Sequence, residues 1–188
     1  KQPLTLPVVP SRKDIEKLFS VANDVKQRLI LMLAYGSGLR ISEIASLKIN
    51  NIDSEQMCIK VEQGKCHKDR FVLLSPQLLI ELRRYWKVYR PTSWLFPGKN
   101  ANSPVKPLTI HRVWKKIKEK SGLRKHFGLH SLRHAFATHM LENGIDLYTI
   151  KQLLGHSSIR TTVRYLRLTK QQMAKTLSPL DLLKFPEA

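Results

Sequence analysis

The segment from residue 25 to residue 35 constrains the fold of this chain more than any other stretch. It places six apolar side chains in direct succession, which are Leu29, Ile30, Leu31, Met32, Leu33 and Ala34. A helix formed here is apolar on nearly every face, whereas a helix on a protein surface keeps a polar face. The sequence therefore predicts a domain built around a buried central helix that ends at Gly36-Ser37-Gly38.

The rest of the chain shows patterns typical of amphipathic helices and of one hairpin. Apolar residues recur at helical spacing, with Ser, Asp or Gly at the expected helix ends. Two short extended runs around a charged turn favour a β-hairpin. The predicted fold class is mainly α with a small antiparallel β-sheet. Helices are predicted from Ser11 through Phe19, over 78–89, over 109–120, from His130 to Glu142 and from Asp146 to Gly155, with strands at 58–61 and 71–74.

The strong positive charge points to a polyanionic partner. The 188 residues include 33 Lys plus Arg against 14 Asp plus Glu, a formal net charge of +19. Residues 106–125 alone hold eight Lys or Arg and one Glu, a net +7. A membrane surface is the competing polyanion, but the sequence has no apolar run long enough to span a bilayer and no lipidation signal. We therefore expect nucleic acid as the partner and no membrane association.

The two cysteines, Cys58 and Cys66, give neither a disulfide framework nor a paired zinc signature. This cysteine usage favours a reducing, cytoplasmic setting. The Pro-containing opening, residues 1–10, is too short for a signal peptide and is typical of a linker.

Several polar residues could together carry out phosphoryl transfer, which needs a nucleophile, cations around the non-bridging oxygens and a proton donor for the leaving oxygen. Taken alone, Arg40 could pair with Glu43 or clamp a phosphate, because a cation beside a buried helix needs a partner or a ligand. His130 and Arg133 lie three apart near a predicted helix start, where they could reach one anion or form an ordinary surface pair.

Three further candidates could also act on a phosphate, although in isolation an ordinary structural role is favoured for Lys65 and Tyr165. Lys65 lies in the charged hairpin turn from Gly64 to Arg70, which could simply be solvated. His156 follows a predicted helix end. Tyr165 comes nine residues later, and a single tyrosine is usually a packing residue.

Five short motifs occur in an order and spacing that resemble the tyrosine recombinases, in particular the Xer-like and the phage or integron integrase-like members. They are Gly-Leu-Arg-Ile-Ser-Glu at 38–43, Gly-Lys at 64–65, Leu-His-Ser-Leu-Arg-His at 129–134, Leu-Leu-Gly-His at 153–156, and Tyr165. Each is weak alone, but five in register over almost the whole chain are specific. The resemblance implies the tyrosine recombinase/integrase catalytic-domain fold. It also implies a site-specific recombinase of bacterial or phage origin, associated with the nucleoid, that cleaves and rejoins DNA through a 3′-phosphotyrosyl bond.

The resemblance implies a role for each candidate. Tyr165 would be the nucleophile, and Arg40 and Arg133 would hold the non-bridging oxygens of the scissile phosphate. His156 would add a hydrogen bond there, Lys65 would protonate the departing 5′ oxygen, and His130 would assist proton transfer at the tyrosine hydroxyl. Glu43 would orient the catalytic residues through its contacts with them. No metal and no other cofactor is expected.

The family position of the basic helix over 109–120 implies that it enters the major groove of double-stranded DNA. The expected DNA contacts are Lys68, Arg70, His111, Arg112, Lys115 and Lys116. The resemblance also implies a homotetramer on two DNA sites for the full-length protein, in which the segment after Tyr165 docks on a neighbouring protomer. For the isolated domain we favour a monomer whose tail docks on itself.

The chain departs from the family pattern in two places. Cys66 stands where the family hairpin often has a second glycine, and the N-terminal DNA-clamping domain of the family is missing. We therefore expect residues 1–10 to be a linker from such a domain, residues 11–175 to be the catalytic domain and residues 176–188 to be a C-terminal tail.

Three other functions compete with recombination. His126, His130 and His134 are spaced four apart and could line a metal site on one helix face. A type IB topoisomerase-like enzyme would use the same chemistry to nick or relax DNA. A catalytically silent DNA-binding module of the same fold would use none of it.

Overall fold

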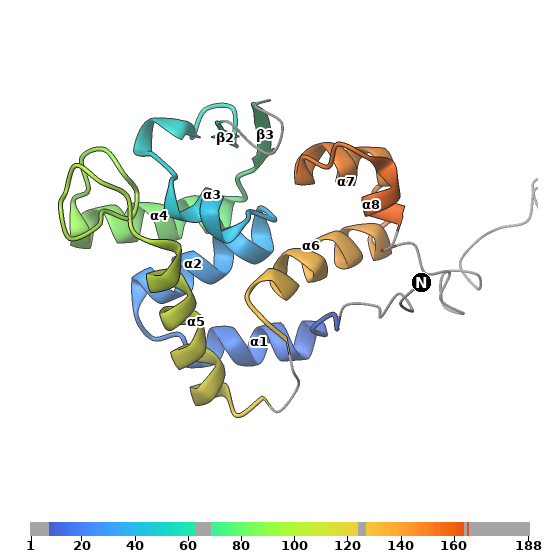
Figure 1. Ribbon diagram of the computed structural model, residues 1–188, viewed down its shortest axis with the longest axis horizontal. Helices are drawn as coiled ribbons and strands as arrows, with labels where there is room; N and C mark the ends of the chain where they lie inside the picture. Colours follow the sequence, from blue (N-terminus) through green and yellow to red (C-terminus); the bar gives the residue numbers. More distant parts are fainter. Residues whose placement is uncertain (1–7, 63–68, 124–126, 164, 166–188) are drawn as a thin grey trace, which may run out of the picture.

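The computed structural model describes residues 8–62, 69–123, 127–163 and 165 (Figure 1). In these residues the fold is mainly helical with one three-stranded antiparallel sheet, which confirms the predicted fold class. The elements in chain order are α1 Arg12–Val21, α2 Val25–Gly36, α3 Ile41–Ala45, the 3₁₀ helix η1 Ile49–Asn51, β1 Ile52–Asp53, β2 Cys58–Val61, β3 Arg70–Leu73, α4 Pro76–Tyr89, α5 Pro107–Ser121, α6 His130–Glu142, α7 Leu147–Leu154 and α8 Ile159–Val163.

Side-chain caps explain where most of these helices begin. Ser11 and Asp14 form a capping box at the start of α1, in which the Ser11 hydroxyl accepts from the Asp14 amide and Asp14 accepts from the Ser11 amide at 2.9 Å. Asp24 caps α2, Ser75 caps α4 and Asp146 caps α7. These contacts are local, so the predicted starts at Ser11 and Asp146 are confirmed.

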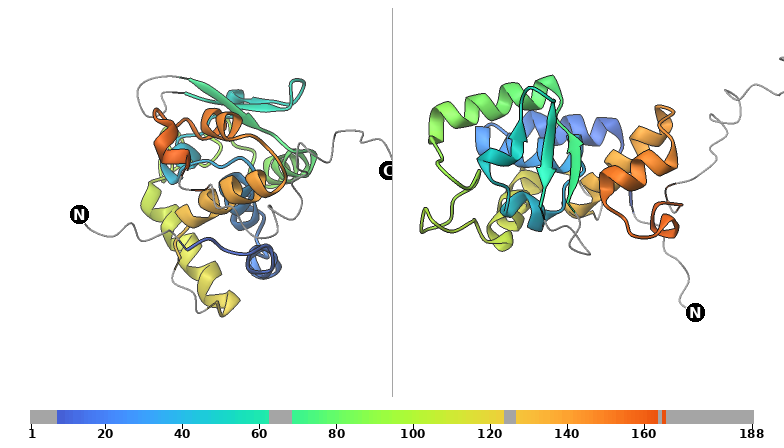
Figure 2. Two further views of the ribbon diagram at one scale, coloured as in Figure 1. Left: turned by 90° about the vertical axis from the view of Figure 1, so that its right-hand side faces the viewer. Right: turned by 90° about the horizontal axis from the view of Figure 1, so that it is seen from above.

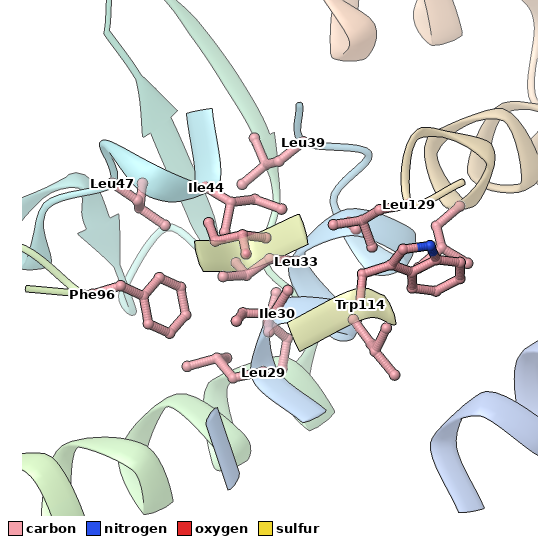
Figure 3. Packing of buried hydrophobic residues seen from close by; sticks show 14 of the residues in the cluster. Leu29, Ile30, Leu33, Leu39, Ile44, Leu47, Phe96, Trp114 and Leu129 are labelled. Carbon is pink, nitrogen blue, oxygen red and sulfur yellow. The ribbon is translucent and has the colours of Figure 1, made fainter. Parts of the chain in front are cut away.

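The helix α2 lies at the centre of the domain, as its apolar sequence predicts. Leu29, Ile30, Leu31, Leu33 and Ala34 are each no more than 1% exposed. The helix packs against α4 and against α6, with α3 and α5 also in contact with it. Figure 3 shows the buried side chains of this core closing around α2 from several elements.

A second, smaller core joins α6, α7 and the segment after α8. It consists of Phe136, Ala137, Ile150, Leu154 and Tyr165. Tyr165, the expected nucleophile, is therefore a packing residue in this structure.

The sheet has the order β1-β2-β3, with Ile59 paired to Ile52 on one side and to Val72 on the other. The hairpin of β2 and β3 was predicted, whereas β1 and α3 were not. β1 has two residues and α3 has five, which is too short for a periodic pattern to show in the sequence.

The two views of Figure 2 agree on how the helices surround this core. The helix α4 lies on one side of the domain, and α5 and α8 lie on the opposite side. The basic helix and the segment that leads to Tyr165 therefore lie on the same side of the domain.

Candidate active site

Glu43 is the centre of a cluster of three arginines that come from separate parts of the chain. It lies in the first turn of α3, where Oε2 accepts from the Arg40 amide at 2.8 Å and Oε1 accepts from Arg40 Nη1 at 2.7 Å. Arg70, from β3, donates to both carboxylate oxygens at 2.9 and 2.8 Å. Arg133 Nη1, from α6, lies 3.7 Å from Oε2. The bidentate Arg70 pair is the strongest geometry available to a carboxylate.

The arginines control the charge state of this buried acid. Burial alone would raise the pKa of Glu43, but the hydrogen bonds and charges of Arg70 and Arg40 outweigh it and lower the pKa to about 2. Burial and the neighbouring charge of Arg40 lower the pKa of Arg133 to about 9, so it stays a cation at neutral pH. The cluster of three arginines and one glutamate therefore keeps an excess of positive charge next to His156.

The same three arginines hold the C-terminal end of α7. Arg70 Nε donates to the Leu153 carbonyl at 2.8 Å, Arg133 Nη2 donates to the Leu154 carbonyl, and Arg40 Nη2 donates to the Gly155 carbonyl at 3.5 Å. The last carbonyls of a helix have no partner within it and favour a cation. This contact fixes the residue that follows, His156, beside the arginine cluster.

Two glycines allow side chains of the site to lie close to the backbone: Arg70 at Gly155 and Phe136 at Gly38. Gly155 has φ +59°, and a Cβ there would lie 2.8 Å from Cδ of Arg70. Gly38 has φ +63°, and a Cβ there would lie 2.7 Å from the ring of Phe136. The Gly38 carbonyl accepts from Arg133 Nη1 at 2.6 Å. Both glycines thus have a left-handed backbone, and a side chain at either position would collide with its neighbour.

A cavity of about 180 Å³ opens above this cluster. Arg40, His130, Arg133 and His156 line it, together with Gly155, Ser157 and Thr161. Of the two arginines that line this space, Arg40 has a side chain that is 22% exposed, whereas the side chain of Arg133 is only 2% exposed. The structure therefore brings four of the six expected catalytic residues to one pocket that can hold an anion.

His156 is neutral at physiological pH in this setting. Burial, followed by the charges of Arg133, Arg40 and Arg70, lowers the pKa of His156 to about 4. Its Nδ1 shares a hydrogen bond of 2.9 Å with the Thr162 hydroxyl. When Nδ1 accepts from Thr162, the other ring nitrogen carries the proton and can donate to a phosphate oxygen.

His130 is exposed at the start of α6. The expectation that free N–H groups at this helix start would favour an anion is only partly met. The amides of Ser131 and Leu132 already donate to the carbonyls of Gly128 and Leu129 at 2.9 and 3.0 Å. The positive charge of the pocket therefore comes mainly from the arginines.

Tyr165 lies next to His156 but is not among the residues that line the pocket. The residue is 5% exposed, and its ring stacks on that of His156 with 6.5 Å between centroids. A hydrogen bond of 2.6 Å joins its hydroxyl to Nδ1 of His134. The sequence had placed His134 at the end of the motif at 129–134 and in the competing metal site, and had given it no catalytic role. Its spacing of four from His130 puts both on one face of α6, but nothing local identifies Tyr165 as its partner.

The expected DNA contacts fall into three groups. His111, Arg112, Lys115 and Lys116 are all exposed on α5. Lys68, like the proposed general acid Lys65, lies outside the described residues. The expectation for Arg70 needs correction, because its side chain is only 9% exposed and its guanidinium is occupied by Glu43 and Leu153. Arg70 supports the site and is not placed to contact a DNA groove.

Within the described part of the chain, no group of three His, Cys, Asp or Glu side chains is arranged to hold a metal ion. His126, the third histidine of the competing metal site, lies outside that part. Among the same residues, no helix is both long and apolar enough to cross a membrane.

Known proteins resemble this chain over nearly its whole length. Residues 11–172 match the phage integrase family. The chain is 45% identical over 186 residues to the putative integrase/recombinase y4eF of Sinorhizobium fredii, covering 99% of this chain and 74% of that protein. It is 38% identical over 187 residues to the tyrosine recombinase XerA of Pyrococcus horikoshii, covering 98% of this chain and 65% of that protein.

Solved structures show the same fold. A crystal structure of XerA recombinase superposes with a TM-score of 0.79 at 32% identity, covering 92% of this chain and 65% of that one. The XerH site-specific recombinase, bound to its difH substrate before cleavage, gives a TM-score of 0.77 at 25% identity, covering 91% of this chain and 53% of that one. The chain thus spans about half to three quarters of the proteins it matches. It belongs to the phage integrase family.

Proposed function

We propose that this chain is the catalytic domain of a site-specific DNA recombinase that cleaves and rejoins DNA through Tyr165. The observation that carries the proposal is the convergence of Arg40, His130, Arg133 and His156 on one pocket, with the tyrosine beside it. The names of the relatives, among them tyrosine recombinases and an integrase/recombinase, support the same activity.

In the proposed reaction, the Tyr165 oxygen attacks the scissile phosphorus while the bond from phosphorus to the 5′ oxygen breaks. The products are a 3′-phosphotyrosyl bond and a free 5′ hydroxyl. His130 assists removal of the phenolic proton, and Lys65 donates a proton to the leaving oxygen. Rejoining is the reverse reaction with a new 5′ hydroxyl. The phosphodiester energy is kept throughout, so no nucleotide cofactor is consumed.

The arginines supply the electrostatic stabilisation that this reaction needs. Charge builds on the non-bridging oxygens in the transition state, and fixed cations lower its energy without reorganising. Glu43 holds Arg40 in place by its two contacts of 2.8 and 2.7 Å. Arg133 is fixed by two carbonyls, those of Gly38 and Leu154. The pocket is thus preorganised before any phosphate enters.

The DNA would lie on the side of the domain that carries α5 and α8 (Figure 2). His111, Arg112, Lys115 and Lys116 of α5, which are all exposed, would contact its groove or phosphates. XerH was solved bound to its difH substrate, which supports a double-stranded DNA partner here. In the full-length protein we expect a homotetramer on two DNA sites and a cytoplasmic, nucleoid-associated location.

Covalent trapping tests the proposal without knowledge of the target site. A library of nicked duplexes with a randomised centre is incubated with the chain, and adducts that survive denaturant are sequenced. We expect a 3′ adduct whose peptide carries the phosphate on Tyr165, identified by mass spectrometry. Tyr165→Phe should bind DNA and form none. No adduct with the parent chain would favour a silent DNA-binding module, and an adduct on another residue would exclude Tyr165.

Two further assays distinguish a type IB topoisomerase-like activity from recombination. Relaxation of any supercoiled plasmid, with no joining between two duplexes that carry the selected site, would indicate a relaxing enzyme. Strand exchange between such duplexes would indicate recombination.

A further inference from the structure

A polar network joins the end of β2 to the 3₁₀ helix η1. Glu62 directly follows β2, and each oxygen of its carboxylate has its own donor. Oε1 accepts from Asn51 Nδ2 at 2.9 Å, and Oε2 accepts from Lys48 Nζ at 3.1 Å. Asn51 Oδ1 in turn accepts from the Lys48 amide at 3.0 Å. We call the three residues Lys48, Asn51 and Glu62 the hairpin anchor, because they connect the strand hairpin to η1.

The η1 side of the hairpin anchor is fixed in the core. Asn51 is only 5% exposed. The Ile49 amide donates to the Ser93 carbonyl at 2.9 Å, and the Leu95 amide donates to the Leu47 carbonyl at 2.8 Å. Both leucines are buried. The segment that carries Asn51 is therefore held in place by backbone contacts and by the core.

The other strand of the hairpin is tied to the same part of the chain. Val61 and Arg70 form the last described pair of the ladder between β2 and β3, and Arg70 donates to both carboxylate oxygens of Glu43 on α3. One strand end is thus held by η1 and the other by α3. The turn between them carries Lys65, the proposed general acid, which lies outside the described residues. Three residues span at most about 11 Å, so the position of Glu62 limits where Lys65 can lie.

We propose that Asn51 and Glu62 are positioning residues that aim Lys65 at the leaving 5′ oxygen by holding the hairpin on η1. This inference rests on the proposed function, because it takes Lys65 as the general acid. A displacement of about 1 Å in a reacting group can slow a reaction about 100-fold. The arginine cluster has its own contacts with Glu43, so the hairpin anchor should affect protonation of the leaving oxygen more than phosphate binding.

Reversing the polarity of the Asn51–Glu62 pair tests the hairpin anchor through the single-turnover rate of adduct formation at saturating DNA. Asn51→Asp keeps an acceptor for the Lys48 amide but sets a second carboxylate against Glu62, so we expect adducts to form about ten- to 100-fold more slowly. The double variant Asn51→Asp/Glu62→Gln restores a donor–acceptor pair and should recover the rate. Glu62→Ala removes both contacts of an exposed side chain without adding repulsion, and should also be slow. A double variant as slow as Asn51→Asp would overturn the proposal.

A sulfur atom in place of the bridging 5′ oxygen separates leaving-group protonation from other effects. A thiol has a pKa of about 8.5, so a thiolate departs without a proton donor. On this duplex we expect Asn51→Asp and Lys65→Ala to match the parent rate, although both are slow on the ordinary duplex. A slow Asn51→Asp on both duplexes would mean that the hairpin anchor acts on the fold or on the arginines, and the proposal would be wrong. A slow Lys65→Ala on both would show that Lys65 is not the general acid.

Lys60 offers a matched control on the same strand. Its Nζ lies 3.1 Å from Oδ2 of Asp69, the same distance as between Lys48 and Glu62, and both pairs are similarly exposed. This ion pair joins the two strands to each other and does not involve η1. Lys60→Gln should therefore leave the adduct rate unchanged. A rate as slow as that of Asn51→Asp would mean that any weakening of the hairpin explains the effect, which would contradict the proposal.

Backbone hydrogen exchange measures the hairpin anchor without DNA. We expect amides at the Val61–Arg70 end of the ladder to exchange about two- to tenfold faster in Asn51→Asp, as for the loss of one ordinary hydrogen bond. The double variant should exchange at the parent rate. Equal exchange in all three proteins would overturn the hairpin anchor while leaving the proposed function untouched. A parent chain that forms no adduct would instead refute the proposed function, and with it the role of Lys65, whatever the exchange rates are.

Discussion

Arg70 binds both carboxylate oxygens of Glu43, at 2.9 and 2.8 Å, and both side chains are 9% exposed. A residue expected on the DNA surface is thus the main partner of the acid that organises the site. A buried ion pair of this geometry does not by itself imply a gain in stability, but removing one member leaves a buried charge with fewer partners.

Arg70→Met should therefore destabilise the fold by about 3–5 kcal/mol, the typical cost of breaking a buried pair. Arg12→Met is the control, because Arg12 is 57% exposed and its pair with Glu142 at 3.8 Å should contribute at most about 1 kcal/mol. Urea unfolding measures both. An Arg70→Met variant with parent-like stability and weaker DNA binding would restore the original expectation of a DNA contact.

Gly155→Ala should disrupt the site more than its backbone strain alone predicts. A non-glycine residue at positive φ costs about 1–2 kcal/mol, and here a Cβ would also lie 2.8 Å from Cδ of Arg70. Gly122 also ends a helix, α5, at φ +62°, but a Cβ there meets nothing within 4 Å. We expect Gly122→Ala to lose stability alone, and Gly155→Ala to lose more stability and also adduct formation. Equal effects would show that Arg70 tolerates the methyl group.

Stability should decrease in two steps as the pH falls. His156 has an ordinary pKa of 6.5 and about 4 in the fold, so the unfolded chain binds more protons between these values. The contribution of His156 to the free energy of unfolding is complete above pH 6.5 and is lost as the pH falls toward 4. Glu43, with a pKa lowered from 4.5 to about 2, adds a loss below pH 4.5. Unfolding free energies across pH 3–8 measure this profile. His156→Asn should flatten the upper step only, and a profile unchanged by that substitution would argue against a neutral buried His156.

Lys116→Ala should weaken DNA binding evenly across sequences. One lost phosphate contact lowers the slope of log affinity against log salt by about 0.9. Lys87 is a matched control, since it is an exposed lysine on α4, on the opposite side of the domain from α5. Titrations at several salt concentrations compare the two. A larger effect of Lys87→Ala would place the DNA on the other side of the domain.

Local features of the fold could be predicted because their causes are local. Ser11 and Asp146 cap helices through contacts within three residues, and the burial of α2 follows from its unbroken apolar run. The elements that were missed, α3, η1 and β1, are too short to leave a period in the sequence, and their position depends on contacts with the rest of the core.

The sequence motifs were enough to predict the chemistry of the site, since residue types, order and spacing identify which groups could act on a phosphate. Only the tertiary structure decided which residues lie next to these groups. Arg70 and Glu43 are 27 positions apart, and His134 and Tyr165 are 31 positions apart. Such pairs form because the arginines close on the end of α7 and because the second core encloses the tyrosine. The energy of these contacts depends on burial and on distant partners, which no local stretch of sequence contains.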